Sequence, residues 1–351
     1  MKRILLIIGA SCLFALFLYS PQACINGSAD AAYTFLYIVL PSLFPFFFAV
    51  RLLIDSGIVA IFSRVLEKPT RLIFGFPGCF SYVFLCSLLS GYPAGARATC
   101  DLYKSGCIDR KCAEHMINAA STSGPMFIIG TIGAGLLRYP QLAWYVMAAH
   151  IISAIITAII AGFSCRTYIP SPPIQSQNQP GIIDMIYSAV MSGLKSMMLV
   201  GGFMLIFGAA AGGLESLPIY QALPSEAQAI TAGCMEMTTG VVRTDALPLQ
   251  TQLIVISCII AFGGASIHLQ TYSLCATVGL RPRSFMLSKL MQTGLAAGCC
   301  VLLLKLFPPG VVTVSTAFST SQSTSYCGFA MAAFAILSAL IIRPMINRRK
   351  N

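Results

Sequence analysis

Long apolar runs separated by short polar or basic stretches extend along almost the whole chain. Most runs approach the ~20 residues with which an α-helix crosses a bilayer. None shows the strict alternation typical of transmembrane β-strands, so the pattern predicts an all-α polytopic membrane protein. About eight membrane-crossing helices are expected, over residues 4–20, 31–54, 114–137, 142–165, 182–214, 249–279, 284–306 and 328–342.

Two further apolar segments are expected to enter the membrane and return as re-entrant helical hairpins. Phe74–Lys104 has basic stretches on both flanks, which the positive-inside rule places on one side. Its tip is predicted at Ser90-Gly91-Tyr92-Pro93. Ala227–Leu247 is short and contains Thr238-Thr239-Gly240, the predicted second tip.

The positions of charged residues predict the topology. Basic residues cluster after residue 54, after residue 95, around residues 281–283 and at the C-terminus, whereas the loop Glu215–Glu226 is acidic. Both termini are therefore expected on the cytoplasmic side. The start, Met1-Lys2-Arg3 before an apolar run, also resembles a signal peptide, but we expect a retained helix because many spans follow.

Composition supports a membrane protein and excludes several other classes. The chain is 57% hydrophobic and 9% charged, against roughly 25% charged in soluble domains. The net charge of +11 arises from basic residues in the predicted cytoplasmic loops. The sequence contains no basic stripe of the kind that binds nucleic acid, so nucleic-acid binding is not expected. The 14 cysteines lie mostly within apolar runs and lack zinc-knuckle spacing, so neither a metal site nor another cofactor is expected.

The order of the segments predicts an inverted repeat. After an N-terminal helix (1–30), the first repeat would cover 31–165 and the second 182–306, with a Pro/Gln/Ser-rich linker (166–181) between them. Residues 307–351 would form an outer loop, the last helix and a basic tail. Each repeat would contain a span, a hairpin and two further spans, in opposite orientations. Secondary transporters use such repeats for alternating access around a central site.

Matched interruptions support this repeat. The span after each hairpin contains small residues, Ser121–Pro125 in the first repeat and Gly263–Ser266 in the second. Helices that restart at membrane depth direct free N–H groups and partial positive charge toward the tips. Paired breaks of this kind are expected to attract an anion.

Ionisable and polar residues near the breaks are the candidate binding residues, because they are costly within apolar runs. Lys195 could pair with a substrate carboxylate or with Glu236, and Glu236 could bind a coupling cation or proton. For His268 a purely structural hydrogen bond is the alternative. The predicted substrate-binding residues are Ser90, Gly91, Tyr92, Pro93, Asn118, Ser121, Thr122, Ser123, Gly124, Lys195, Glu236, Thr238, Thr239, Gly240, His268 and Gln270.

No hydrolase, metalloprotease or P-loop motif is found, so no enzyme activity is expected. The expected partners are a small anionic solute and the lipid bilayer, without nucleic acid. A coupling cation or proton, and a homo-oligomer, are compatible with the sequence.

Four segments resemble the sporulation integral membrane protein YlbJ family: Leu40–Pro45, Ser90–Ala96, Ser123–Gly130 and Ile267–Gln270. The resemblance covers nearly the whole chain, and Ser90-Gly91-Tyr92-Pro93-Ala94-Gly95 is its most specific element. It implies a nucleoside-recognition Gate domain similar to that of concentrative nucleoside transporters. It also implies a location in the outer forespore membrane and transport of dipicolinic acid from mother cell to forespore.

Three functions remain open from the sequence. The first is a carrier of a small organic anion such as dipicolinate, and the second is a carrier of a nucleoside or other neutral solute with the same fold. The third is a non-transporting spore-membrane assembly factor, in which the breaks would serve packing alone.

Overall fold

The computed structural model describes residues 2–55, 58–92, 94–137, 139–165 and 181–309, which contain helices and no strand. Residues up to Pro308 belong to one unit. The α-helices of the first half are α1 (Lys2–Tyr19), α2 (Pro21–Thr34), α3 (Leu40–Asp55), α4 (Ile58–Phe74), α5 (Cys79–Ser90), α6 (Ala94–Lys104), α7 (Arg110–Ala119) and α8 (Pro140–Gly162). Those of the second half are α9 (Ile182–Glu215), α10 (Pro218–Gln221), α11 (Ser225–Met235), α12 (Met237–Val242), α13 (Leu249–Phe262), α14 (Gly264–Ala276) and α15 (Phe285–Leu306).

Four short helical segments of other types complete the described chain. Two are π-helices, η1 and η2, and two are 3-10 helices, η3 and η4. Their bounds are Phe35–Val39, Met126–Leu136, Phe163–Cys165 and Arg243–Ala246, in that order. Since η1 joins α2 to α3 without a break, these three elements form one long helix.

Five helical segments in the described ranges are long and apolar enough to cross a membrane, and the bent α4–α5 pair is a sixth candidate. The five correspond to predicted spans, although the first begins earlier than expected: Pro21–Ala49, Pro140–Cys165, Ile182–Glu215, Leu249–Ala276 and Phe285–Leu306. Residues 9–19 and η2 are shorter apolar helices. The predicted span 328–342 lies outside the described residues. The protein is therefore an all-helical membrane protein, while the exact number of spans stays a prediction.

The first predicted hairpin has the expected helix–break–helix form. Helix α5 ends at Ser90, and α6 starts at Ala94 and packs beside α5. The next predicted span, 114–137, consists of α7 and η2 separated by a non-helical stretch at Ser121–Gly124. The interruption predicted there from small residues is thus confirmed as a break in the helix.

The second predicted tip was placed wrongly. Thr238, Thr239 and Gly240 lie inside α12, and the break is at Glu236, whose backbone is extended (φ −141°, ψ 124°). The Glu236 carboxylate accepts a hydrogen bond from the Thr239 backbone N–H at 2.8 Å. A carboxylate that satisfies a free N–H at a helix start favours initiation immediately after it, so the helix resumes earlier than the glycine suggested.

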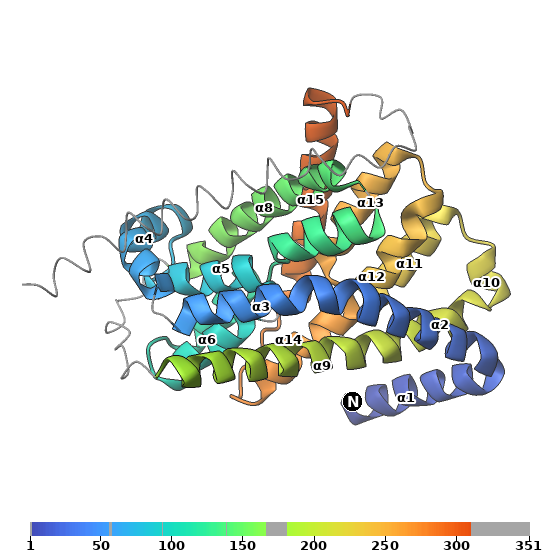
Figure 1. Cartoon of the computed structure of the whole chain (residues 1–351), viewed down its shortest axis with the longest axis horizontal. Helices are drawn as coiled ribbons and strands as arrows, with labels where there is room; N and C mark the ends of the chain where they lie inside the picture. The colour runs from blue at the N-terminus through green and yellow to red at the C-terminus, as the bar shows by residue number, and fades with distance from the viewer. Residues whose placement is uncertain (1, 56–57, 93, 138, 166–180, 310–351) are drawn as a thin grey trace, which may run out of the picture. The chain divides into compact units, whose positions relative to one another are not determined.

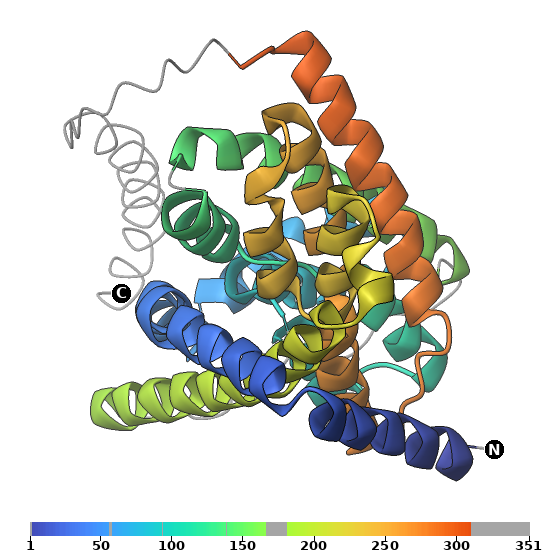
Figure 2. The ribbon, with the colours of Figure 1, turned by 90° about the vertical axis from the view of Figure 1, so that its right-hand side faces the viewer.

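Helix α9 runs antiparallel to the long α2–η1–α3 helix, and the two lie side by side over much of their length (Figure 1). Small residues permit this approach. A Cβ on Gly27 would lie 2.9 Å from the Gly212 Cα, so a glycine at position 27 lets the α2 and α9 backbones touch. Figure 2 shows the same pair from the side, with α15 crossing the other side of the unit.

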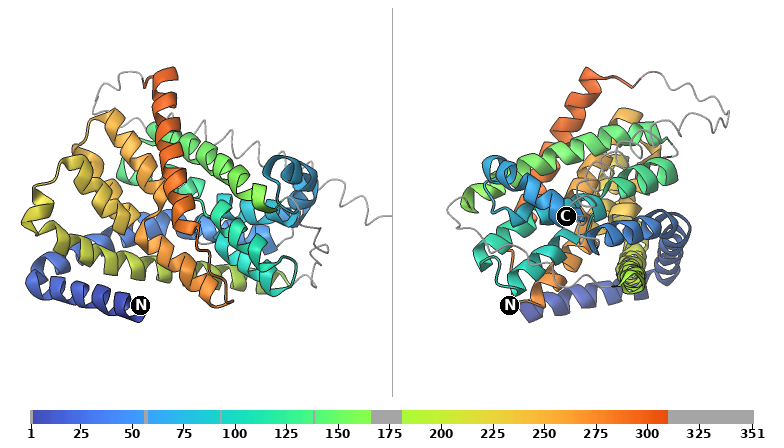
Figure 3. Two further views of the ribbon diagram at one scale, coloured as in Figure 1. Left: turned by 180° about the vertical axis from the view of Figure 1, so that it is seen from behind. Right: turned by 60° about the vertical axis from the view of Figure 1, so that its left-hand side comes forward.

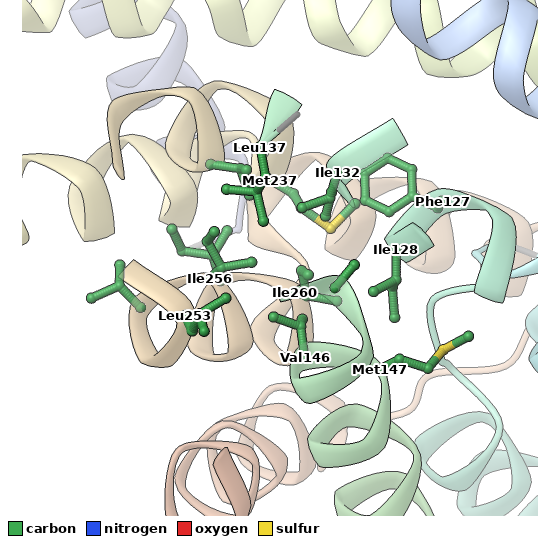
Figure 4. Close-up of a cluster of buried hydrophobic side chains, with 14 of the residues drawn as sticks. Phe127, Ile128, Ile132, Leu137, Val146, Met147, Met237, Leu253, Ile256 and Ile260 are labelled. Atoms are coloured by element: carbon green, nitrogen blue, oxygen red, sulfur yellow. The ribbon is translucent and has the colours of Figure 1, made fainter. Parts of the chain in front are cut away.

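The main apolar core lies where η2, α8, α12 and α13 meet (Figure 4). Ile128, Val146, Ile256 and Ile260 are fully buried there. Helix α15 packs against both α8 and α13, as the view from behind shows (Figure 3). These contacts tie second-half helices to the first half and hold the broken helices between them. That the two halves are inverted copies stays a prediction.

Candidate functional site

The two breaks of the first half touch each other. Gly91 adopts φ +73° and ψ −161°, a conformation that side chains rarely permit. A Cβ on Gly91 would lie 2.7 Å from the backbone nitrogen of Gly124, and one on Gly124 would lie 3.0 Å from the Leu89 carbonyl oxygen. Glycine is therefore required on both sides of this contact.

Side chains accept hydrogen bonds from the backbone N–H groups that lack helical partners at the first-half breaks. The Thr122 N–H donates to Ser87 Oγ at 3.1 Å, and the hydroxyls of these residues lie 2.9 Å apart. The Ser123 N–H donates to Nε2 of buried His150 at 2.9 Å. Non-helical backbone within a membrane requires such partners, because lipid supplies none. His150 was not among the predicted residues, although its position inside the apolar run 142–165 is a signal that could have identified it.

The two breaks of the second half make an equivalent contact. Helix α13 ends at Gly263 (φ +85°), and Gly264 (φ +73°) starts α14. A Cβ on Gly264 would lie 2.8 Å from the Gly233 carbonyl oxygen and 3.1 Å from that of Met235, next to the Glu236 break. In both halves, therefore, a glycine at one break packs on the backbone at the other.

Three of the breaks, and the start of the helix that follows the fourth, line one cavity, the central cavity, of about 50 Å³. Eight predicted binding residues are in its wall: Ser90, Gly91, Tyr92, Ser123, Gly124, Glu236, Thr238 and Gln270. Residues of η1, α3 and α9 complete it, together with Leu89, Met126, Phe127, Met237, Ser266 and Ile267. The structure thus brings together polar groups from four separate parts of the sequence.

Six predicted residues lie outside this wall and have structural contacts. Asn118 donates to Ser284 Oγ at 2.7 Å, and the His268 ring nitrogen Nε2 lies 3.1 Å from the Phe262 carbonyl oxygen. Thr239 hydrogen-bonds Glu236. The others are Ser121, Thr122 and Gly240. Pro93 lies outside the described residues.

Lys195 is not at the cavity. Its side chain is exposed on α9, and it does not contact Glu236, whose carboxylate accepts hydrogen bonds from Thr238 and Thr239. The predicted pairing of Lys195 with Glu236 is therefore wrong. In a membrane helix, position within the apolar run does not reveal which face meets the protein interior.

A different lysine, Lys289 of α15, is fully buried beside the first-half breaks. Its Nζ donates to the Tyr92 hydroxyl at 3.1 Å, to Gln292 Oε1 at 2.8 Å and to the Ser121 carbonyl oxygen. Three donations use the whole capacity of an ammonium group. No carboxylate lies within ion-pair distance of Lys289 among the described residues. Its position inside the apolar run 284–306 is the signal that could have identified it.

The central cavity adjoins two others. The arginine cavity, of about 80 Å³, includes Arg51 and Arg97 and shares Phe47, Ser90 and Tyr92 with the central cavity. On the other side, a cavity of about 240 Å³ between α2 and α9, the α2–α9 cavity, shares Met204 and Thr238 with it. The central cavity is the smallest of the three and shares wall residues with each of the other two.

The charges differ along this series of cavities. The central cavity contains the Glu236 carboxylate and the buried Gln270 Oε1, which has no hydrogen-bond partner among the described residues, and its lining has no lysine or arginine. In the α2–α9 cavity, Arg243 binds Glu215 through Nε at 2.8 Å. Arg243 is therefore neutralised by a carboxylate from another helix, Glu215 of α9.

One curated protein is clearly similar to the chain. The sporulation integral membrane protein YlbJ of Bacillus subtilis (strain 168) is 28% identical over 326 residues, which cover 81% of this chain and 78% of that protein. No protein-family model and no solved structure matches the chain. The described helices are those of a helical membrane protein, as the name of this relative also says of it. This similarity bears out the resemblance to the YlbJ family of sporulation integral membrane proteins that the sequence showed.

Proposed function

We propose that the protein is a carrier of a small organic anion, without enzymatic activity, that works by alternating access at the central cavity. One observation supports this above all others: helix breaks from both halves, or the helix turn that follows one, line the smallest of three adjoining cavities. This cavity is the proposed constriction of the substrate pathway. Carriers bind substrate at such breaks, because unwound backbone supplies polar groups at membrane depth. Packing alone would not require these breaks to line a common cavity.

Dipicolinic acid, moved from the mother cell toward the forespore, is the proposed substrate. The similarity to a sporulation integral membrane protein supports a role in sporulation, and the resemblance noted from the sequence points to this dicarboxylate. First turns of η2, α12 and α14 line the central cavity and carry partial positive charge. The proposed location is the outer forespore membrane, with both termini on the mother-cell side.

Glu236 is the proposed site of a coupling cation or proton. It is 4% exposed and lies in the cavity wall, where a negative group would oppose an anion unless a cation accompanied it. Its contacts with two threonine side chains hold both carboxylate oxygens in place. The cation at Glu236 would then offset the negative charge of the carboxylate while the anion passes the central cavity.

A carrier of a nucleoside or other neutral solute is the second candidate. The observation that favours it is the same acceptor-rich wall, since Gln270 Oε1 has no partner among the described residues and the lining contains no basic side chain. A solute with several O–H or N–H donors would match such a wall.

Uptake of radiolabelled dipicolinate and uridine into proteoliposomes distinguishes these functions. Saturable dipicolinate uptake is expected. Saturable uptake of uridine alone would replace the first proposal with the second, and uptake of neither would refute both and favour an assembly factor.

A pair of neighbouring substitutions tests the role of the central cavity. Val200 of α9 lines it, whereas adjacent Leu199 is exposed at 37%. Val200→Trp is expected to abolish uptake by filling the cavity, and Leu199→Trp to leave uptake intact. Equal rates in the two variants would show that the substrate does not pass this point.

A further inference from the structure

The two arginines of the arginine cavity are in different electrostatic situations. Arg51 is neutralised within α3, because its Nε and a terminal nitrogen each lie 3.0 Å from a different oxygen of Asp55. Arg97, in the first turns of α6, is partly buried and has neither an ion pair nor a side-chain hydrogen bond among the described residues. A partly buried guanidinium with five unused N–H donors is costly unless a ligand or water satisfies it.

A second positive charge lies behind the wall shared with the central cavity. Tyr92 lines both cavities, and Lys289 donates to its hydroxyl and lies 4.9 Å from its ring centroid. Tyr92 in turn donates to the Ile260 carbonyl oxygen at 3.3 Å, which keeps the ring in the wall. Tyr92 thus separates the central cavity from Arg97 on one hand and contacts a second cation, the buried Lys289, on the other.

We infer that Arg97 binds a carboxylate group of the transported anion, and that the arginine cavity is the site where the anion is held next to the constriction. The inference rests on the proposed anion-carrier function and adds to it the location of the anion-binding charge. It also explains how a carrier of anions can have a central cavity without a lysine or arginine. Lys195, the sequence-based candidate, has no part in this site.

The chemistry of the cavity fits a carboxylate. The guanidinium fork donates two parallel hydrogen bonds to a carboxylate, which gives orientation as well as charge. Ser90 and Ser192 add hydroxyls to the lining. Asp101 also lines the cavity, but its side chain is exposed, so solvent screens its charge more than that of Arg97. A dicarboxylate held by Arg97 would have its second carboxylate free to face the shared wall at Tyr92.

The test compares four proteins in dipicolinate uptake: the wild type, Arg97→Gln, Arg97→Lys and Lys104→Gln. Lys104 is the matched control, because it is an exposed cation in the last turn of the same helix. Arg97→Gln is expected to raise KM about ten-fold or more, since two charge-assisted hydrogen bonds are lost. Arg97→Lys should lie between this variant and the wild type, because it keeps the charge and loses the fork. Lys104→Gln should match the wild type.

Asp101→Asn tests the same site in the opposite direction, because it removes a negative charge that repels the anion. Its KM for dipicolinate is expected to be no higher than the wild-type value, whereas that of Arg97→Gln rises. An unchanged KM in folded Arg97→Gln would overturn the inference while leaving the carrier function in place. If Arg97→Gln does not fold, Arg97→Lys decides, and a wild-type KM there would overturn the bidentate contact. Absence of dipicolinate uptake by the wild type would instead refute the proposed function itself.

Discussion

Alanine at Gly91 should destabilise the protein for two separable reasons. The first is backbone strain, because φ +73° with ψ −161° is a region used almost only by glycine and costs about 1–3 kcal/mol for other residues. The second is contact, because the new Cβ would meet the Gly124 backbone nitrogen at 2.7 Å. Overpacking against backbone costs about 1–3 kcal/mol, so the total is about 2–6 kcal/mol.

Gly106 is the matched control for this substitution. It has the same φ of +73° and is exposed after α6, and a Cβ added to it would have no other atom within 4 Å. Gly106→Ala should therefore carry the strain alone, about 1–2 kcal/mol. Because the backbone region of Gly91 is the more strained of the two by up to about 1 kcal/mol, a larger excess loss in Gly91→Ala measures the contact between the two first-half breaks.

Thermal unfolding of the purified protein in detergent measures both variants, and dipicolinate uptake measures the consequence for transport. Gly91→Ala should melt several degrees below Gly106→Ala, at roughly 2–4 °C per kcal/mol for medium-sized domains. Uptake should fall in Gly91→Ala alone, because only that change moves the wall of the central cavity. Equal melting temperatures and equal uptake would refute the close contact of the breaks.

Three further predictions concern helix packing, the buried lysine and the coupling site. Gly27→Ala should lower the free energy of unfolding by about 1–3 kcal/mol, because its Cβ meets the α9 backbone. Gly202→Ala, which has open space around it, should raise the free energy of unfolding by up to about 1 kcal/mol, and thermal unfolding measures both variants. Lys289→Met should reduce uptake at least about ten-fold, since it removes two hydrogen bonds that hold the first-half breaks, one to Tyr92 and one to Ser121, and wild-type uptake would contradict this role. Glu236→Gln should abolish the dependence of uptake on an imposed cation or pH gradient, and a dependence that persists would place the coupling site elsewhere.

Local chemistry explains which breaks could be predicted from the sequence. At Ser90–Tyr92, at residues 121–124 and at Gly263, glycine and small polar residues interrupt long apolar runs, and the structure breaks at these places. At the fourth break the same reasoning failed. The position of this break was decided by the Glu236 carboxylate, which caps the following helix by accepting a hydrogen bond from the Thr239 backbone N–H. The positions of glycine in the sequence do not indicate this hydrogen bond.

The binding residues could be predicted only in part. Half of the sixteen predicted residues line the central cavity, because polar residues beside breaks tend to face the interior. The same reasoning does not distinguish Lys195 from Lys289, because both lie within apolar helices and only Lys289 is buried. The tertiary structure also decides that Arg97 has no ion-pair partner among the described residues, while Arg51 is neutralised by Asp55.

The sequence by itself determined a helical membrane protein with interrupted spans, because helix length, apolar content and glycine act locally. Only the tertiary structure decided which faces of the helices meet, which break touches which, and where the unpaired charges lie. The physical reason is that lipid and protein interior are both apolar. The side of a membrane helix that faces lipid and the side that faces its neighbours therefore share one composition, and packing alone distinguishes them.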